Sequence, residues 1–557
     1  MPAYIGGPAW PELDVALARR DFPAVLTLAE NETSVDVGER QLVIGICRAM
    51  FHQSEQAVAA LVDSMQASRA ERPARAAVAA VFLGRLHYFV HDSPSVANGW
   101  FARARRLVED QPDCIEHALA ALPLPGCDIV DVTRLHADAT SALALARRLG
   151  DPNVEAKALA DLGTAQVSRA FVAEGMTLLD EAMAMVLSGE ASSPFAAIEV
   201  VCNLLSSCAR VGDLSRADQW TRAADRHLGL GIDEGPAFLY AHCRINLGLI
   251  LCDVGRWDEA EVTLRLASSR TAHAGPRVEG QVRAALAELW VLQGRLDDAE
   301  RLLAGRHEHQ DCLLPLAALH LARGAWADAA AVARHGIRLM GDDRVRAARL
   351  HAICVEAELA SGHTEQARAD ADQLAAVTAD HALPVLRART ELARGRVAEA
   401  SDQTSAAVAA YQAGLQVLAD NDWPLIRAEL HLSLGRMLAS SETCAAITEA
   451  RAAHLTYERL GSPLANQSAQ LLNTLGIEAT VRPRRADATA ALSRRESEVL
   501  DLLREGLSNA DIAARQHNSV RTIEHHVSAI LAKLGLRSRA EAAAYAASLE
   551  ASRTRGG

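Results

Sequence analysis

A short polar face near the C-terminal end of the chain carries side chains that could contact DNA bases. Arg521, Glu524, His525 and Ser528 follow one another at intervals of one to three residues, and on a helix they fall on one side or at its edge. Their guanidinium, carboxylate, imidazole and hydroxyl groups can donate to or accept from the base edges in the major groove of duplex DNA. The chemistry that this face offers is therefore reading of DNA bases by hydrogen bonds.

Two capped helices must position this face. Ser519 is placed to cap a helix that Gly535 ends, and one apolar stripe runs along it at i, i+4, i+7, i+8 and i+11: Ile523, Val527, Ile530, Leu531 and Leu534. Before it, Ser508 caps a shorter helix through Arg515, with Asp511 at the matching third position. The sequence predicts a helix hairpin with a tight turn.

Two further helices flank this hairpin. Ser493 and Glu496 have capping-box spacing and open a helix with an apolar face at Val499, Leu500, Leu502 and Leu503, which Gly506 ends. Ser538 and Glu541 repeat the spacing for a fourth, alanine-rich helix to about Ser548. Four short helices around a hairpin predict a helix-turn-helix module whose second hairpin helix enters the major groove.

This module resembles the C-terminal DNA-binding domain of LuxR-type (LuxR/FixJ) bacterial transcription regulators. The residues that carry the resemblance lie along the first three helices and just after them: Leu492, Arg495, Glu496, Glu498, Val499, Gly506, Leu507, Ser508, Asn509, Ile512, Ala513, Ser519, Thr522, Ile523, His526, Val527, Lys533, Leu534, Gly535 and Arg539. The resemblance covers about a tenth of the chain.

The resemblance implies roles for individual positions. Glu524, His525 and Ser528 stand where the family reads bases, and Arg521 joins them from the helix pattern alone. Thr522 and Lys533 stand where the family contacts phosphates, and Ser508 and Asn509 would present a helix N-terminus to another phosphate. The fourth helix stands where the family commonly dimerises, so a homodimer through this C-terminal helix is expected.

Four positions depart from the family pattern. At the turn, where apolar residues are usual, stand Gln516 and Asn518, and an unpaired buried amide costs about 1 to 3 kcal/mol. In the groove, where a basic residue is frequent, stand Glu524 and Ser528. Glu524 would repel phosphates, although a carboxylate can accept from cytosine N4 and so add selectivity at the cost of affinity.

A different pattern fills the body of the chain: an apolar helical stretch, a glycine, and an alanine five residues later. The glycines are Gly212, Gly255, Gly294, Gly324, Gly362 and Gly395, separated by 43, 39, 30, 38 and 33 residues. A glycine can end one helix, acidic residues can open the next, and alanine lets the two pack closely. The pattern resembles the tetratricopeptide repeat in a degenerate form.

These units predict an all-α fold: a helical-repeat (tetratricopeptide-like) superhelix followed by the four-helix module. The repeat is clearest from Asn203 to about Leu418, "LPLPGCDIVDV" from Leu122 interrupts the fragments upstream, and a helix pair over residues 446–476 closes the array. The expected domains are a repeat body over 1–476, a proline- and arginine-containing linker over 477–491, the helix-turn-helix domain over 492–551, and a disordered tail over 552–557.

Charge and composition narrow the classes of function. Residues 482–557 carry 13 basic and 9 acidic residues, a net charge of +4, whereas the other 481 carry 44 and 61, a net charge of −17. A basic tail suits a polyanion, and the acidic body does not. The chain's two lysines, Lys157 and Lys533, both follow alanine, so no GxxxxGK[ST] phosphate loop exists.

Other chemistry has weaker signals. The ten cysteines are scattered without a Cys-x-x-Cys pair, and most of them are expected to be buried thiols of a reduced, cytoplasmic protein with no membrane span. His525 and His526 point about 100° apart on a helix, so they cannot readily share a metal ion, and His307, His309 and Cys312 lack a fourth ligand. We expect no metal, no cofactor and no enzyme activity.

The sequence favours a sequence-specific transcription regulator. Its repeat body would bind an effector peptide, protein or small molecule at the repeat surface and control the C-terminal domain's contact with double-stranded DNA. The alternative is a helical-repeat interaction scaffold or anti-regulator with a weakened DNA-binding tail, which Glu524, Gln516 and Asn518 favour.

Overall fold

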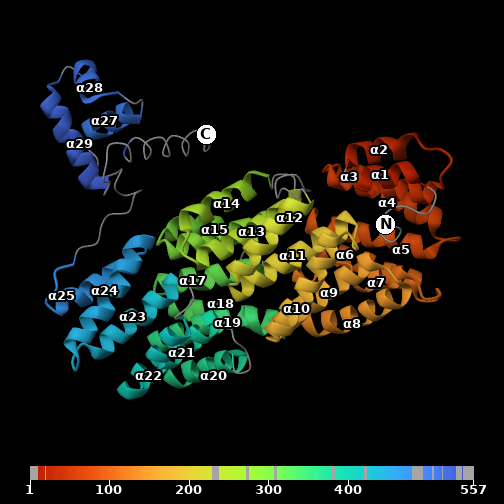
Figure 1. Cartoon of the computed structure of the whole chain (residues 1–557). Coiled ribbons are helices and arrows are strands. Elements are labelled where there is room, and N and C mark those ends of the chain that lie inside the picture. The colour runs from red at the N-terminus through yellow and green to blue at the C-terminus, as the bar shows by residue number, and fades with distance from the viewer. Residues whose placement is uncertain are drawn as a thin grey trace. The chain divides into compact units, whose positions relative to one another are not determined.

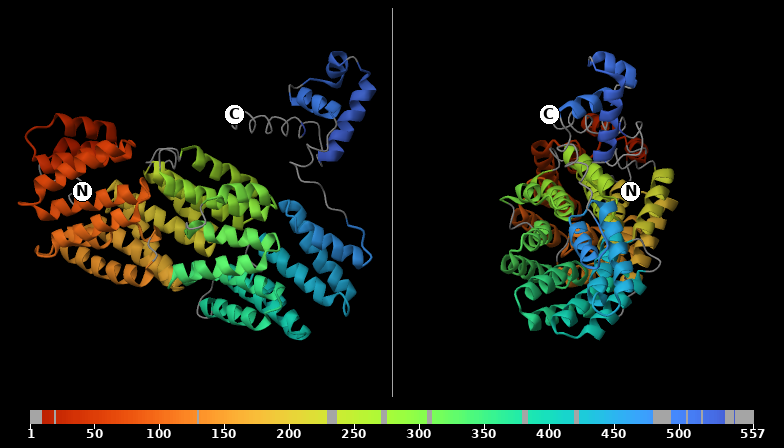
Figure 2. Two further views of the ribbon diagram at one scale, coloured as in Figure 1. Left: turned by 180° about the vertical axis from the view of Figure 1, so that it is seen from behind. Right: turned by 90° about the vertical axis from the view of Figure 1, so that its left-hand side faces the viewer.

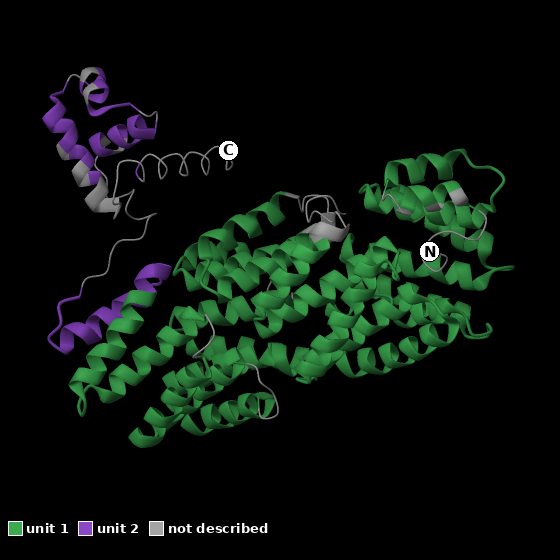
Figure 3. Cartoon of the chain, in the orientation of Figure 1, with its two compact units in different colours: residues 1–456 green, residues 457–557 purple. Residues whose placement is uncertain are grey.

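The computed structural model describes residues 10–18, 21–128, 131–228, 237–270, 275–305, 310–378, 384–418, 423–479, 494–504, 507–516, 518–534 and 542. Over these residues the regular elements are all helical (Figure 1), and the chain divides into two compact units, residues 1–456 and 457–557 (Figure 3). The all-α prediction is confirmed. The expected domain boundaries stay predictions, because residues 480–493 and 543–557 lie outside the described residues.

The described residues of the first half of the array form twelve α-helices. They are α1 (Pro11–Ala18), α2 (Phe22–Asn31), α3 (Val37–Met50), α4 (Ser54–Ser68), α5 (Pro73–Phe89), α6 (Pro94–Val108), α7 (Ile115–Ala121), α8 (Val132–Leu149), α9 (Pro152–Ser168), α10 (Val172–Ser188), α11 (Pro194–Val211) and α12 (Leu214–Leu228), with the 3-10 turn η1 (Gly126–Asp128). Pro at the first helical position opens α5, α6, α9 and α11, where a missing amide hydrogen costs nothing.

The second half continues in the same way. Its helices are α13 (Ala237–Asp253), α14 (Trp257–Arg270), α15 (Pro276–Leu292), α16 (Leu296–Leu303), α17 (Leu313–Ala322), α18 (Trp326–Met340), α19 (Arg344–Ala360), α20 (Thr364–Thr378), α21 (Pro384–Ala400), α22 (Thr404–Val417), α23 (Pro424–Leu438), α24 (Thr443–Leu460) and α25 (Ala465–Thr474), with the 3-10 turn η3 (Gln310–Cys312). The expected closing pair over 446–476 corresponds to α24 and α25.

The helices pack as successive hairpins. Each odd-numbered helix from α3 to α21 packs on the even-numbered helix that follows it, and odd-numbered helices also pack on one another in a row from α3 to α23. Figure 2 shows this stack from two further sides. One helix row with a second row behind it is the tetratricopeptide-like arrangement that the glycine-alanine pattern predicts.

Five of the six predicted glycines end helices. Gly212, Gly255, Gly294, Gly324 and Gly362 have φ between +73° and +81°, a conformation that glycine adopts without steric cost. The alanine five residues after each is at most 1% exposed. The hairpin turn and the close helix contact therefore have the residues that the pattern assigns to them.

The prediction for Gly395 is wrong. Gly395 lies inside α21, and the turn comes at Asp402, which has φ +55° and is followed five residues later by the fully buried Ala407. Gly395 serves another purpose, because a Cβ there would lie 2.2 Å from Cε1 of Tyr411 on α22. Glycine is needed here for close packing of two helices, not for a turn.

Other hairpin turns also use residues other than glycine. His52, Asp92 and Ala170 have φ of +61°, +47° and +75°, and each is followed five residues later by a buried small residue. These residues accept a left-handed backbone that costs roughly 1 kcal/mol or more without glycine. The repeat extends upstream to α3, although its glycines do not mark it there.

The segment expected to interrupt the array is instead the loop of one hairpin. Residues 122–128 follow α7 in the connection to α8, and their backbone bonds to side chains of α5, α9 and α11. The amide of Gly126 donates to Asp161 Oδ1 (2.8 Å), and the amide of Cys127 donates to Asn203 Oδ1 (2.9 Å). The carbonyls of Pro123, Leu124, Cys127 and Asp128 accept from Arg85, Lys157, Arg210 and Tyr88, respectively. A buried loop is tolerated here because its polar backbone groups find partners.

A buried ion cluster holds these helices under the loop. Lys157 Nζ lies 2.9 Å from Asp161 Oδ2 and 2.5 Å from Glu199 Oε2, and Arg85 Nη1 lies 2.8 Å from Glu199 Oε1. Burial by itself lowers the pKa of Lys157, but the two carboxylates raise it more strongly, so the amine stays charged. Two cations and two anions balance one another, which a buried charge requires.

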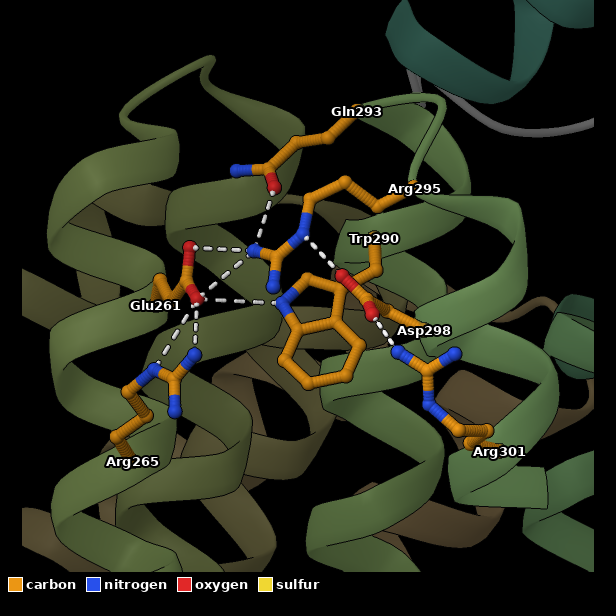
Figure 4. Close-up of polar contacts among 7 residues, drawn as sticks. All are labelled: Glu261, Arg265, Trp290, Gln293, Arg295, Asp298 and Arg301. Carbon is orange, nitrogen blue, oxygen red and sulfur yellow. Dashed lines mark hydrogen bonds and ion pairs between the residues drawn. The ribbon is translucent and has the colours of Figure 1, made fainter. Parts of the chain in front are cut away.

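A second polar cluster links α14 to the α15–α16 hairpin (Figure 4). Arg295 Nη1 lies 3.0 Å from Glu261 Oε1, and its guanidinium carbon lies 4.2 Å from the centre of the Trp290 ring. Trp290 Nε1 also donates to Glu261 (3.3 Å). Arg295 directly follows the turn glycine Gly294, so this turn also carries a contact between neighbouring hairpins.

One described helix, α11, is long and apolar enough to cross a membrane, with a mean hydropathy of 1.3 over 18 residues. Within the protein, 78% of this stretch is buried. It packs on α9, α10 and α13, as a core helix does.

Replacing either of two intrahelical glycines with alanine should change the stability of the body, but in opposite directions. Gly395→Ala places a Cβ against Tyr411 and should destabilise the body by about 1 to 3 kcal/mol. Gly99→Ala on α6, where a Cβ would meet nothing within 4 Å, should stabilise it by about 0.5 to 1 kcal/mol. Urea denaturation followed by circular dichroism measures both, and midpoints that shift in the same direction would contradict this account of Gly395.

Two arginines of the α14–α16 cluster should differ in importance. Arg295→Ala removes an ion pair and a cation-π contact and should lower the opening free energy of α15 and α16 by about 1 to 3 kcal/mol. Arg301 pairs with Asp298, but its side chain is 71% exposed, so Arg301→Ala should cost less than about 1 kcal/mol. Amide hydrogen exchange over residues 276–303 compares them, and equal costs would refute the cluster's role.

Candidate nucleic-acid interface

The last three described helices of the C-terminal unit share a common core. They are α27 (Arg494–Arg504), α28 (Asn509–Arg515) and α29 (Val520–Leu534). Their buried apolar residues form one cluster with Ala542: Val499, Leu500, Leu503, Ile512, Ala513, Ile523, Val527 and Ile530. The predicted apolar faces are confirmed at these positions, while the side chains of Leu531 and Leu534 lie outside the described residues.

Both predicted serine caps of the hairpin are present. Ser508 Oγ accepts from the amide of Asp511 (3.2 Å), and Asp511 Oδ2 accepts from the amide of Ser508 (3.1 Å), which is a reciprocal capping box. Ser519 Oγ accepts from the amide of Thr522 (3.1 Å) at the start of α29. The caps fix where α28 and α29 begin and so set the direction in which α29 presents its side chains.

The face of α29 opposite the core is polar and exposed. Ile523 is fully buried, whereas Arg521, Thr522 and Glu524 are exposed. From the helix period alone, His525 and Ser528 are expected on the side of Arg521, and Lys533 about three turns after Thr522 on the same flank. The side chains of His525, Ser528 and Lys533 lie outside the described residues, as does the fourth helix expected over residues 538–548.

Comparison with known proteins identifies the domain that these helices form. Residues 490–546 match the GerE model, which describes the luxR family of bacterial regulatory proteins. The C-terminal domain is a LuxR-family helix-turn-helix domain. The resemblance drawn from the sequence is confirmed for this part of the chain.

Curated relatives match the chain over a stretch of about the same length. The response regulator protein VraR of Staphylococcus aureus and that of Staphylococcus epidermidis are each 41% identical to the chain over 63 residues. That stretch is 11% of this chain and 30% of the relatives' own length. Among solved structures, the Cut9-Hcn1 hetero-tetramer of APC/C aligns over 83% of this chain and 95% of its own, with 13% identity and a TM-score of 0.35.

The polar turn of the LuxR-family domain differs from expectation at one of its two positions. The side chain of Asn518 is exposed. Its backbone N–H donates to the carbonyl of Ala513 (2.9 Å), and this bond ends α28. Gln516 is half-buried, and its Oε1 is a buried atom without a hydrogen-bond partner among the described residues. The expectation of two buried amides is therefore wrong for Asn518, because the turn uses its backbone and leaves its side chain in solvent.

The N-terminus of α28 has a feature that the sequence alone did not reveal. The hydroxyl of Ser508 lies 2.5 Å from Asp511 Oδ2, so both the hydroxyl and the amide of Ser508 are directed at this carboxylate. These hydrogen bonds lower the pKa of Asp511, which keeps it anionic. A phosphate at this end of α28 would meet a negative charge, and the phosphate contacts expected of Ser508 and the half-buried Asn509 stay predictions.

Val520 is a candidate contact that the motif comparison missed. It is the first residue of α29, next to Arg521, and it is 43% exposed although it is apolar. An exposed aliphatic side chain at the start of a recognition helix can pack on the methyl group of thymine. The apolar stripe predicted from the sequence begins at Ile523 and assigned Val520 no role.

Metal binding has no support in the part of the chain that the structure describes. No group of three or more His, Cys, Asp or Glu side chains there could hold an ion. Cys312 is buried, and His307 and His309 lie outside the described residues.

The two polar turn residues should respond differently to apolar replacement. Gln516→Leu removes a buried oxygen without a described partner and should slow amide exchange in α28 and α29, by about 1 kcal/mol of local stability. Asn518→Ile changes an exposed side chain and should leave exchange nearly unchanged. Hydrogen exchange on the full chain tests the pair, and faster exchange in Gln516→Leu would mean that this amide makes a stabilising contact.

Proposed function

We propose that this protein is a sequence-specific DNA-binding transcription regulator whose helical-repeat body binds an effector or partner and controls the C-terminal domain. The observation that carries the proposal is the exposed polar face of α29, opposite a buried core, in a LuxR-family domain. In this proposal Arg521, Glu524, His525 and Ser528 read bases, and Ser508, Asn509, Thr522 and Lys533 contact phosphates. Access to the chromosome requires a cytoplasmic protein, and no catalytic role is proposed.

The repeat body supports the sensing half of the proposal through its architecture. A row of packed helices offers a long surface for a peptide, a protein or a small molecule. Residues 122–128 lie on α5, α9 and α11, so the chain itself covers that part of the row. We infer that an effector binds further along the array. A homodimer through the fourth C-terminal helix remains part of the proposal.

The rival function is an interaction scaffold or anti-regulator with a weakened DNA-binding tail. Exposed Glu524 on the reading face and Asp511 at the N-terminus of α28 favour it, because both would repel phosphates. Gln516 Oε1 favours it as well, since a partly satisfied turn weakens a small domain.

Alanine substitutions of two oppositely charged residues on the same turn of α29 distinguish these functions. If the domain binds DNA, Arg521→Ala should weaken binding by about 5- to 150-fold, corresponding to about 1 to 3 kcal/mol. Glu524→Ala should tighten binding to unrelated DNA and flatten the preference among sequences. Binding of the full chain to labelled duplexes should also fall steeply with salt. No binding at low salt by the full chain or by residues 486–557 would favour the scaffold.

Selection of bound fragments from random duplex DNA tests sequence reading directly. The full chain is used first alone and then with cell extract. Enrichment of a common sequence supports a regulator, and a change on adding extract supports an effector. Recovery of random sequence in both cases would contradict the proposal.

A further inference from the structure

Three cysteines and a histidine from distant parts of the chain meet beside the buried loop of residues 122–128. Cys202 on α11 and Cys243 on α13 have their Sγ atoms 4.0 Å apart. Cys127 of the loop packs in the same cluster and has its Sγ 3.5 Å from His242 Nε2. The sequence separations are large, so no Cys-x-x-Cys spacing announces the cluster.

We propose that Cys202 and Cys243 are a redox-active thiol pair that closes to an intramolecular disulfide when the protein meets a hydroperoxide. The inference is independent of the function proposed for the C-terminal domain. It rests on the Sγ–Sγ distance and on the unequal exposure of the two thiols.

The two thiols are placed to take different parts in the reaction. Cys243 is half-buried, so a small oxidant can reach it, whereas Cys202 is only 2% exposed. An oxidised Cys243 therefore has Cys202 as its neighbour on a packed helix, and water is largely kept from Cys202. This is the arrangement of an attacked thiol with a resolving thiol next to it.

The chemistry balances with one hydroperoxide for each disulfide. The Cys243 sulfur attacks the peroxide oxygen, the O–O bond breaks, and Cys243 sulfenic acid forms. The leaving oxygen takes up the thiol proton and departs as an alcohol, or as water when the oxidant is hydrogen peroxide. The Cys202 sulfur then attacks the Cys243 sulfur, the S–S bond forms, the S–O bond breaks, and water leaves with the thiol proton. The two sulfurs must approach from 4.0 Å to about 2.05 Å, a shift within reach of side-chain rotation and a small helix movement.

The third thiol has a different environment. Burial and the carboxylate of Asp128 raise the pKa of Cys127 well above its usual value, so it stays protonated beside His242. The hydrogen bond with Cys243 and burial raise the pKa of Cys202 as well, so protonation does not distinguish these two thiols. Cys202 is the resolving group because its Sγ lies 4.0 Å from Cys243 Sγ, whereas Cys127 Sγ contacts His242. A disulfide between Cys202 and Cys243 would join α11 to α13 next to the loop that Cys127 belongs to.

Peptide mapping of the full chain after treatment with hydrogen peroxide tests the proposal. Free thiols are blocked, the protein is digested without reduction, and crosslinked peptides are identified by mass. The expected product is a peptide pair joined through Cys202 and Cys243, with loss of two hydrogens and recovery of both thiols on reduction. Exposed Cys444 reports the oxidant dose in the same sample.

Variants separate this pair from general thiol oxidation. Cys202→Ala and Cys243→Ala should each abolish the crosslink, whereas Cys354→Ala, at a buried cysteine of α19, should keep it. Circular dichroism checks that each variant stays folded. The peptide map of the wild-type protein tests the proposal even if a variant does not fold. The proposal is overturned if Cys444 is oxidised while Cys202 and Cys243 both stay free, or if the crosslink joins Cys127 instead.

Discussion

The buried contact between Lys157, Asp161 and Glu199 is the interaction on which the middle of the array depends. It holds α9 and α11 together and lets residues 122–128 cross them with their backbone groups paired. From this loop, contacts reach other parts of the stack: Arg210 bonds Cys127 O and pairs with Asp343, which caps α19, and Tyr88 on α5 contacts Arg277 on α15. Hairpins far apart in the sequence are thereby joined, so the array is more than a chain of nearest-neighbour contacts.

The distribution of charge along the chain affects how strongly the C-terminal domain could bind DNA. The domain and its flanks carry a net charge of +4, against −17 for the rest of the chain. In the proposed contact with DNA, exposed Glu524 on α29 and Asp511 at the N-terminus of α28 would bring negative charge towards the phosphates. Weak general attraction makes each base contact more important, because phosphate contacts supply most of the non-specific affinity. Under the proposed function, the domain would therefore gain selectivity at the cost of binding strength.

The glycine-alanine pattern predicted the helix-hairpin stack correctly, and its one error is instructive. Glycine is used for two different physical reasons, a left-handed turn or a close contact between helices. A glycine in the sequence does not by itself indicate which of the two applies. At Gly395 the neighbour is Tyr411, and the turn passes to Asp402. Further upstream, His52, Asp92 and Ala170 take the turn position that glycine takes elsewhere, so the glycine pattern did not indicate those hairpins. The alanine or glycine five residues later is the steadier signal, because its burial between helices permits no larger side chain.

The sequence by itself determined the helices, their caps and the family of the C-terminal domain, because these depend on residues within a few positions of one another. Ser508 with Asp511, Ser519 with Thr522, and the stripe through Ile523, Val527 and Ile530 are local patterns of this kind. The tertiary structure decided what depends on distant residues: the exposure of Asn518, the use of residues 122–128 as a buried loop, the ion cluster at Lys157, and the meeting of Cys202 with Cys243. Such contacts arise from how helices stack, and no spacing along the chain encodes that.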